Sequence, residues 1–511
     1  MSTLPLPPEG LEAQPGRDRG RTTDPAARRG LWARAALAAG RRIESFFGGP
    51  ARTRVIVVFG GVLALSSADT ATVGASATPL RHALHVTNSD LGLLVGVNCI
   101  VAAVASLPFG VIADRFRRKT VLGVSIVLWG VCMVWSALVN SFDHLLVSRL
   151  ALGVVTASAG PVIASMLGDW FPGAERGRIY SYVLTGELLG GGVGFAITGD
   201  VSALSWRLSF LLLAVPAFLL ARMVFRLPEP LRGGRGVILP GATEIPTRPV
   251  VAADPLDEVD DAADNVAHHV SRSKGVEPDR DQVLDVEPGR MGFWQAVRYI
   301  MSIRTNVAMI VASALSYFYL TGVQTFGAEL VHQQYGINQA LANLLLLVVG
   351  LGAVVGVLVG GRLGDSLLRR RFLNGRVFVA AISAAIAAGA FIPALLTHHP
   401  MRALPYLMLA AFGLSAQNPP LNAARLDIMP APLWGRAEGV RTFLRTAAQA
   451  LAPMLFGFTS DYVFGGGQHA LKWTFLVMLA PLAASTLYLF RALRSYPTDV
   501  ATAAAFHDER R

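Results

Sequence analysis

The chain has 511 residues, of which 53% are hydrophobic and only 15% are charged. Soluble globular domains carry about 25% charged residues, so this composition excludes an ordinary soluble protein. Uncharged tracts such as 91–113 and 340–361 exceed the roughly 20 residues with which a helix crosses a bilayer. The net charge of +11 does not indicate nucleic-acid binding, because the basic residues gather at the ends of the apolar tracts.

The chain is predicted to begin with a polar tail, residues 1–52, whose stretch 31–47 is basic and amphipathic and should lie on the membrane surface. Six apolar spans follow and make up a predicted N-terminal bundle, residues 53–227. They start near Arg54 and continue at 90–113, 119–140, 145–168, 178–199 and 205–226.

A polar segment, residues 228–304, interrupts the apolar pattern. Its Pro-, Gly- and acid-rich part, 228–290, is predicted to be disordered, and 291–303 is predicted to form an amphipathic helix on the membrane. Six more spans make up a C-terminal bundle, residues 305–494, and a tail, residues 495–511, ends the chain. These spans lie at 305–328, 339–362, 376–396, 402–425, 437–460 and 471–492.

The order of six spans, a linker and six spans predicts the fold class: an all-α membrane protein with 12 transmembrane helices in two pseudo-symmetric six-helix bundles. The basic loops 115–119 and 369–371 lie on the same predicted side as the arginine-rich N-terminal tail. Short cytoplasmic loops carry an excess of Lys and Arg. We therefore expect a multi-pass protein of the cell membrane with both termini and the linker in the cytoplasm.

An internal repeat relates the two predicted bundles. The stretch "PGAERGR", 172–178, shares the pattern P-x4-G-R with "PAPLWGR", 430–436, which lies 258 residues later. The stretch "GVIAD", 110–114, matches "GRLGD", 361–365, at a similar separation. Either match alone is weak, but two in the same order indicate that the first six spans correspond to the last six.

The same separation of 258 residues places Glu187 opposite Arg445, two charges of opposite sign at one position of the repeat. Each lies nine residues after a Gly-Arg pair, which is about 13 Å along a helix at 1.5 Å per residue. Charges at that depth cost at least ~2.5–3.5 kcal/mol when they face lipid. We expect both to face the space between the bundles, as a gate pair, a substrate site or a proton site; a static ion pair is an equally good explanation. The glycines after Glu187 would let a neighbouring helix come close.

Other polar side chains recur in the four spans that the repeat relates, the first, fourth, seventh and tenth. The candidates are Asp69, Arg149, Thr156, Tyr317, Gln324, Asn418 and Asn422. A cavity lined by these spans explains the pattern, although hydrogen bonding between helices explains the hydroxyls and amides comparably well. For Asp69 and Arg149 we favour a function, because ionisable groups at depth are expensive.

The stretch "GVIADRFRRK", 110–119, resembles the G-x-L-A-D-R-x-G-R-K signature of the major facilitator superfamily, with Arg117 at a position where that signature prefers glycine. The resemblance covers residues 53–495 and implies a cytoplasmic gate that joins the halves when the protein faces outward. The residues it assigns to this gate, with the repeat counterpart of the signature acid, are Gly110, Asp114, Arg118, Asp169 and Asp365, and Arg441 marks the expected partner region.

Within that superfamily, stretches such as "WRLSF" and "LPEPLRGG" resemble the spinster-like branch. Asp69 falls at the acid of its first span and Arg149 at the arginine of its fourth. Two residues depart from the branch: Thr156 stands where it has Glu, and Glu187 lies outside its fifth-span pattern. We interpret the exchange as a relocated protonation site.

The resemblance implies a proton-linked secondary transporter of an amphipathic or hydrophobic organic solute, such as a lysolipid or an organic anion. The alternatives are a multidrug or metabolite efflux transporter and a receptor on the same fold. A membrane enzyme acting on lipid is disfavoured, because the histidines lie mostly in loops and the sequence has no HExxH motif. The sequence also lacks the phosphate-binding G-x4-GK[ST] loop, which makes transport driven by ATP a poor explanation. We expect no cofactor and no metal, and a monomer whose partners are a small-molecule substrate, membrane lipid and protons, with no nucleic acid.

Overall fold

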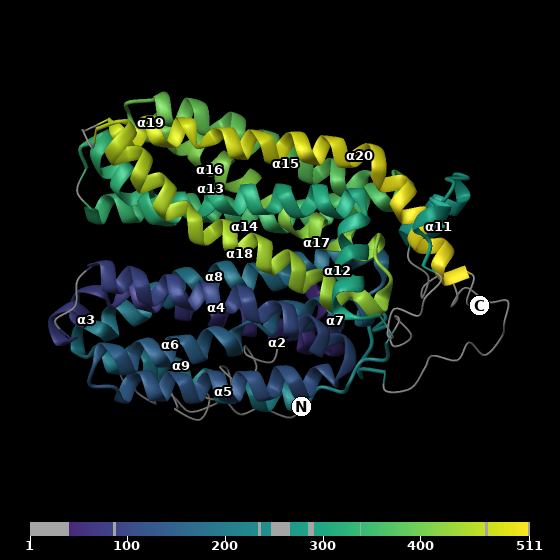
Figure 1. Ribbon diagram of the computed structural model, residues 1–511, viewed down its shortest axis with the longest axis horizontal. Coiled ribbons are helices and arrows are strands. Elements are labelled where there is room, and N and C mark those ends of the chain that lie inside the picture. The colour runs from purple at the N-terminus through teal and green to yellow at the C-terminus, as the bar shows by residue number, and fades with distance from the viewer. Residues whose placement is uncertain are drawn as a thin grey trace, which may run out of the picture.

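The apolar tracts fold into long helices, and the computed structural model describes them over residues 40–84, 88–232, 237–246, 266–284, 291–337, 339–465 and 469–508. These described residues contain no strand. Helices α2 to α9 form one half and helices α13 to α20 form the other, which are the lower and upper parts of Figure 1. The predicted all-α fold of two helical bundles is confirmed.

The first half contains α2 (Pro50–Ala75), α3 (Ala77–Leu84), α4 (Asn88–Arg115), α5 (Arg118–Leu138), α6 (Phe142–Thr156), α7 (Ala159–Trp170), the short η1 (Gly173–Glu175), α8 (Arg176–Leu204) and α9 (Trp206–Phe225). The linker contains α11 (Val266–Ser273), η2 (Arg280–Gln282) and α12 (Phe293–Ser302). The second half contains α13 (Arg304–Tyr335), α14 (Gln339–Arg369), α15 (Gly375–Leu396), α16 (Pro400–Ala416), α17 (Asn418–Asp427), η4 (Ala431–Leu433), α18 (Trp434–Phe458), η5 (Thr459–Val463), α19 (Ala470–Val477) and α20 (Leu479–Asp508).

Nine helical segments of the described chain are long and apolar enough to cross a membrane. The other three predicted spans correspond to α8, to α16 with α17, and to α18. Charged side chains such as Glu187 and Arg445 interrupt the apolar surface of α8 and α18. Both of these helices meet the opposite half, since α8 packs on α14 and α18 packs on α4.

Two spans are divided at the same place in the repeat. The fourth span consists of α6 and α7, and the tenth consists of α16 and α17. The first break follows Thr156, and the second falls at Gln417, which lies 258 residues after the first residue of α7. Pro161 follows the first break, and Pro419 and Pro420 follow the second; proline lacks the backbone N–H that a continuous helix would use.

Glycines bring α8 against α2, as the sequence predicted. A Cβ atom on Gly186 would lie 2.5 Å from the carbonyl oxygen of Gly60. Cβ atoms on Gly190 and Gly194 would collide with the backbone of Ala64 and the side chain of Ala68. The spacing of four residues on both helices places these contacts along one face, so α2 and α8 approach closely just where Glu187 lies.

The linker and the C-terminus differ in part from the expectation. Residues 233–236, 247–265 and 285–290 lie outside the described residues, but α11 lies within the stretch predicted to be disordered and packs on α20. Ala267 and Val270, one helical turn apart, are buried. The expected tail 495–511 is helical to Asp508, because the apolar face of α20 continues past the membrane span and meets α11.

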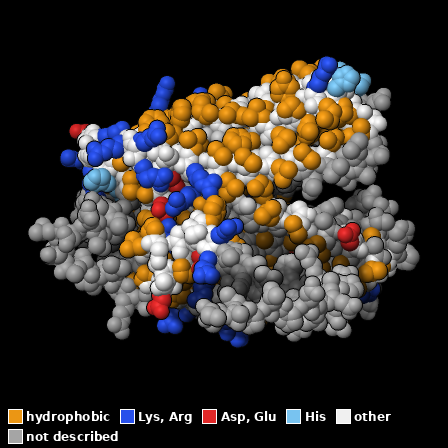
Figure 2. All heavy atoms as spheres, turned by 180° about the vertical axis from the view of Figure 1, so that it is seen from behind, with side chains coloured by type: hydrophobic (Ala, Val, Ile, Leu, Met, Phe, Trp, Pro, Cys, Tyr) orange, Lys and Arg blue, Asp and Glu red, His pale blue; other side chains and the backbone are white. Residues whose placement is uncertain are grey.

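The two ends of the molecule differ in charge. We call the end at which α9 leads into the linker the linker end; α4, α14 and α20 also end there. Figure 2 shows hydrophobic side chains over the outer face of the second half and Lys and Arg side chains gathered toward the linker end. Exposed apolar residues of this half include Ile382, Ile392, Leu409 and Leu487. An apolar face of this extent suits contact with lipid.

The amphipathic segments predicted before each half are helical where they are described. Residues 40–47 are helical, and Phe46 and Phe47 pack on Tyr182 of α8 with ring centroids 5.3 and 4.9 Å away. Helix α12 buries Ala296 and Ile300 and exposes Trp294. Residues 1–39, which include most of the predicted stretch 31–47, lie outside the described residues.

Candidate functional site

Asp69 and Arg149 form a buried ion pair within the first half. The guanidinium of Arg149 on α6 donates to the Asp69 carboxylate on α2 at 3.0 Å. The two residues are only 1% and 2% exposed, and the guanidinium stacks on the Phe210 ring at 4.4 Å. The structure thus brings these two predicted residues together, away from the linker end and without a described bond to the second half.

Thr156 ends α6, where its hydroxyl donates to the carbonyl of Gly153 at 3.2 Å. It lines a small pocket inside the first half together with Ser66 and Trp129. The indole Nε1 of Trp129 is buried without a hydrogen-bond partner among the described residues. A Glu at position 156 would have supplied a carboxylate to this pocket, and the threonine leaves it uncharged.

Glu187 and Arg445 lie on opposite halves, on α8 and α18, and both are half-buried. The charges of Arg445 and Arg441 lie near enough to act on the Glu187 carboxylate, but no ion pair joins Glu187 to any described residue. The guanidinium of Arg445 lies over the Tyr317 ring at 4.6 Å, and its Nε is buried without a described hydrogen-bond partner. A static ion pair is therefore not what holds these two groups in this conformation.

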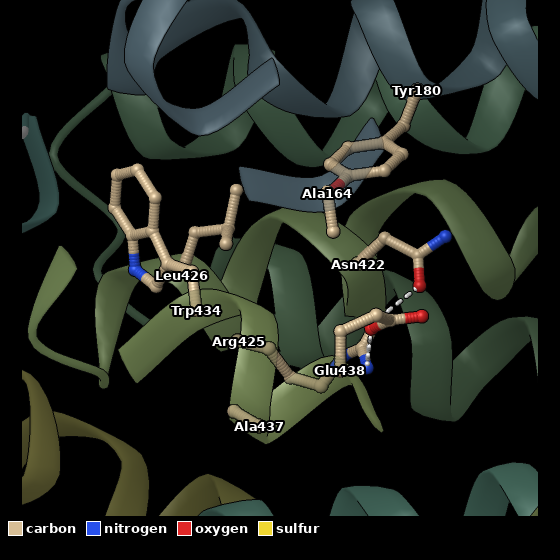
Figure 3. A pocket seen from close by; sticks show the side chains of 8 residues that line it. All are labelled: Ala164, Tyr180, Asn422, Arg425, Leu426, Trp434, Ala437 and Glu438. Atoms are coloured by element: carbon tan, nitrogen blue, oxygen red, sulfur yellow. Dashed lines mark hydrogen bonds and ion pairs between the residues drawn. The ribbon is translucent and has the colours of Figure 1, made fainter. Parts of the chain in front are cut away.

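Arg441, the expected partner of the gate, has a different role. Its guanidinium pairs with Glu438 one turn earlier on α18, with Nε 3.0 Å from Oε2. Arg425 of α17 reaches the same carboxylate at 2.7 Å and also donates to the Asn422 side chain. Figure 3 shows Asn422, Arg425 and Glu438 at a small pocket between the halves. The sequence analysis did not single out Glu438 or assign a role to Arg425.

The predicted gate residue Asp114 binds the start of α18, in the region expected for its partner, but at Gly435 and Arg436 rather than at Arg441. Its carboxylate accepts hydrogen bonds from the backbone N–H groups of Gly435 and Arg436 at 2.9 and 3.0 Å. Gly110 makes room for this approach, since a Cβ there would lie 2.8 Å from the Gly435 carbonyl. The free N–H groups of a helix N-terminus attract anions, so the carboxylate joins the two halves.

Asp365 makes the reciprocal contact. Its carboxylate accepts from the backbone N–H groups of Gly177 and Arg178 at 3.2 and 2.7 Å, at the start of α8. The acid of each repeat thus binds the Gly-Arg pair of the other half, and we call these two contacts the reciprocal latch. The sequence matches that revealed the repeat are the segments that meet across the halves.

Arg118 and Asp169 pair as the resemblance implies, in a buried contact between α5 and α7. Glu229 adds a carboxylate that accepts from the backbone N–H of Arg118 at 2.9 Å and of Lys119 at 3.0 Å. Arg117 has φ −68°, an ordinary backbone conformation, so the absence of the glycine of the signature causes no strain in this turn.

The second half contains the same pair, which the sequence analysis missed. Arg376 binds Asp427 at 2.5 Å and Asp365 at 2.7 Å, with all three side chains buried. Arg376 and Asp427 lie 258 residues after Arg118 and Asp169. The repeat that relates Glu187 to Arg445 was therefore the signal that could have found this pair.

Two predicted residues do not join the charged groups. Gln324 on α13 is exposed, and Asn418 at the start of α17 donates to the Leu414 carbonyl of its own span at 3.2 Å. No group of three His, Cys, Asp or Glu side chains suited to a metal ion occurs in the part of the chain that the structure describes.

Comparisons with known proteins agree with this architecture. The family model of the Major Facilitator Superfamily matches residues 58–453 and 309–509. The hexuronate transporter of Bacillus subtilis is 27% identical over 159 residues, which cover 31% of this chain and only 38% of that protein. The probable sulfoacetate transporter SauU of Cupriavidus necator is 26% identical over 401 residues, 76% of this chain and 83% of that protein.

Two solved structures share the fold. The transporter FucP in the outward conformation superposes with a TM-score of 0.62 at 12% identity, over 86% of this chain and 98% of that one. A bacterial homologue of the human lysosomal transporter Spinster, in an inward-facing and unoccupied conformation, gives a TM-score of 0.52 at 19% identity, over 89% and 98%.

Proposed function

The chain belongs to the major facilitator superfamily, and from this we propose that it carries a small organic anion across the cytoplasmic membrane by secondary active transport. Its relatives and fold neighbours are membrane transporters of small solutes, not enzymes. Hexuronate and sulfoacetate, named for two relatives, are both anions at neutral pH.

Arg445 is the observation on which the proposal rests. A guanidinium at membrane depth is expensive unless a counter-charge or water compensates it. Arg445 has no carboxylate within ion-pair distance in the described chain, and its buried Nε has no hydrogen-bond partner. A planar guanidinium suits two-point binding of a carboxylate or sulfonate, and the Tyr317 ring beneath it offers a surface for the organic part of the solute.

The reciprocal latch supports an alternating-access cycle. It closes the linker end, and the basic loops favour placing this end in the cytoplasm. The conformation would then be outward-facing or occluded, with both termini inside. Transport requires the halves to rock until the latch opens, so a single chain supplies every part that this cycle uses and can work as a monomer.

Glu187 is the candidate for proton coupling. It faces Arg445 across the halves without an ion pair or a described hydrogen bond, whereas the Asp69 carboxylate is already bound to Arg149. The positive charge of Arg445 favours the carboxylate form of Glu187, and a substrate anion bound to Arg445 would neutralise that charge. Coupling of this kind links proton binding to substrate binding.

Counterflow in proteoliposomes tests the cargo. Radiolabelled glucuronate and sulfoacetate are the probes, and a lysophospholipid and a lipophilic cation are the competitors. Arg445→Gln is expected to lower uptake of the anion at least tenfold, whereas Arg402→Gln, which removes an exposed arginine at the opposite end, leaves it unchanged. Exchange of only the lysolipid would favour the spinster-like alternative, exchange of only the cation would favour a drug exporter, and either result overturns the proposal.

The pH dependence tests the coupling. Glu187→Gln is expected to abolish uptake driven by a pH gradient while counterflow, which needs no net proton movement, persists. Normal uptake by this variant with an unchanged pH profile contradicts the role of Glu187, and the Asp69–Arg149 pair would become the next candidate.

A further inference from the structure

A compact cluster of charges lies on α17 and α18 between Arg445 and the linker end. Glu438 lies at its centre. Its carboxylate binds the guanidinium groups of Arg425 at 2.7 Å and Arg441 at 3.0 Å, and it accepts a hydrogen bond from the Thr442 hydroxyl at 3.4 Å. Arg425, Glu438 and Arg441 are 7–9% exposed. In Figure 3 the Arg425 and Glu438 side chains point toward one another beside Asn422.

The first half covers this cluster. The pocket beside Glu438 is lined by Ala164 of α7 and Tyr180 of α8 as well as by residues of α17 and α18. Gly160 of α7 lies so close that a Cβ there would be 3.9 Å from Glu438 Oε1. The same rocking motion that opens the linker end would therefore uncover the cluster.

The cluster has more positive than negative charge. Two guanidinium groups share one carboxylate, and Arg445 follows Arg441 by one turn on α18, so both arginines lie on the same face of the helix. An anion that leaves Arg445 toward the linker end passes Arg441 and Arg425. Without the Glu438 carboxylate, the two arginines of this partly buried site would hold that anion tightly, because charge-assisted pairs strengthen where water is excluded.

We propose that Arg425 and Arg441 form a second, transient anion subsite and that Glu438 competes with the transported anion for it. When the cluster is covered, the carboxylate occupies both guanidinium groups. When the cluster is uncovered, the carboxylate of Glu438 displaces the passing anion and speeds its release. This inference rests on the proposed function, since it requires an anionic solute.

The test is the rate at which a labelled anion leaves the protein. Glu438→Gln keeps the side-chain size and removes the competing charge, so we expect dissociation of bound glucuronate to slow at least fivefold, its Kd to fall and maximal transport to drop. Glu438→Asp keeps the charge and is expected to retain most of the wild-type release rate. Asp143→Asn, which removes an exposed acid at the start of α6, is the control and should change nothing.

A second pair of variants keeps the test decisive if Glu438→Gln does not fold. The double variant Glu438→Gln with Arg441→Gln removes one charge of each sign and is expected to restore release, and Arg441→Gln alone is expected to weaken binding and speed release. An unchanged or weaker affinity in Glu438→Gln, or slow release in the double variant, overturns the inference. Absence of any glucuronate or sulfoacetate binding by the wild-type protein would instead overturn the proposed function.

Discussion

Asp114 and Asp365 join the two bundles through backbone N–H groups as well as through arginines. Arg436 of the other half lies 3.2 Å from Asp114, and Arg376 of the same half lies 2.7 Å from Asp365. Each carboxylate accepts two backbone N–H bonds at the start of a helix in the other half. Hydrogen bonds to a charged group contribute about 1.5–3 kcal/mol each, and the helix dipole adds to them. The strength of the closed linker end therefore depends on these two residues.

Asp114→Asn is expected to weaken the latch. The amide keeps an acceptor but loses the charge, and a loss of about 1–2 kcal/mol corresponds to a ~5–30-fold change in an equilibrium. A single Ser106→Cys in a background without Cys99 and Cys132 reports on opening, because Ser106 is buried against Gly439 between the halves. Its thiol should react faster with a water-soluble reagent in Asp114→Asn. An unchanged rate, with Asp143→Asn as the control, would show that the contact does not hold the halves.

Arg376→Leu is expected to lower stability more than any surface change. The variant leaves the buried carboxylate of Asp365 without its cation and leaves Asp427 with only the more distant Arg176, 3.9 Å away. Removing one partner of a buried pair costs about 3–5 kcal/mol. Thermal unfolding in detergent measures the loss. Arg370→Leu changes an exposed arginine in the turn before α15 and should unfold like the wild type. Equal stability of both variants would contradict the assigned network.

The sequence could reveal a site residue where its partner is another side chain, but not where its partner is a backbone group. Arg376 and Asp427 repeat Arg118 and Asp169 at the separation of 258 residues, so they were predictable. The two backbone N–H groups that Asp114 binds were not, because a backbone N–H belongs to every residue and leaves no mark in the sequence. Arg441 was assigned to the gate for its charge, but Glu438 one turn away occupies it.

The contact between α2 and α8 is set by glycine. Gly190→Ala is expected to push the helices apart, because its Cβ would meet the backbone of Ala64, and overpacking costs about 1–3 kcal/mol. Gly192→Ala is a matched control on the same helix, since nothing lies within 4 Å of the added atom, and it should leave stability unchanged or raise it slightly. Equal unfolding temperatures of the two variants would contradict the close packing.

Helix α11 connects the linker to the second half. Val270→Asp places a charge in the buried face that packs on α20, which is expected to lower the unfolding temperature by several degrees and to expose the segment to proteolysis. His269→Asp introduces the same charge on the exposed neighbouring position and should have little effect. Identical cleavage patterns in both variants would show that α11 does not depend on this contact.

At the scale of the molecule, the sequence predicted the long helices that the bilayer requires. It missed the helical segments that form by packing on other parts of the protein. Length and apolar content identify the long helices, since a spanning segment must satisfy its own backbone, and the repeat gave their order in two halves. The acidic composition around α11 concealed a short helix that packs on α20, η1 and α14. Helix α20 also continues through the predicted tail, where Val500 and Phe506 are buried by protein.

The reciprocal latch has a consequence for how the molecule opens. If each half moves as one bundle, a single rotation stretches the contact of Asp114 with α18 and the contact of Asp365 with α8 together. Neither contact can then break while the other stays formed. The linker end is therefore expected to be either fully closed or fully open, with few intermediate conformations. A partly open conformation, through which ions would leak down their gradient, is thereby kept rare.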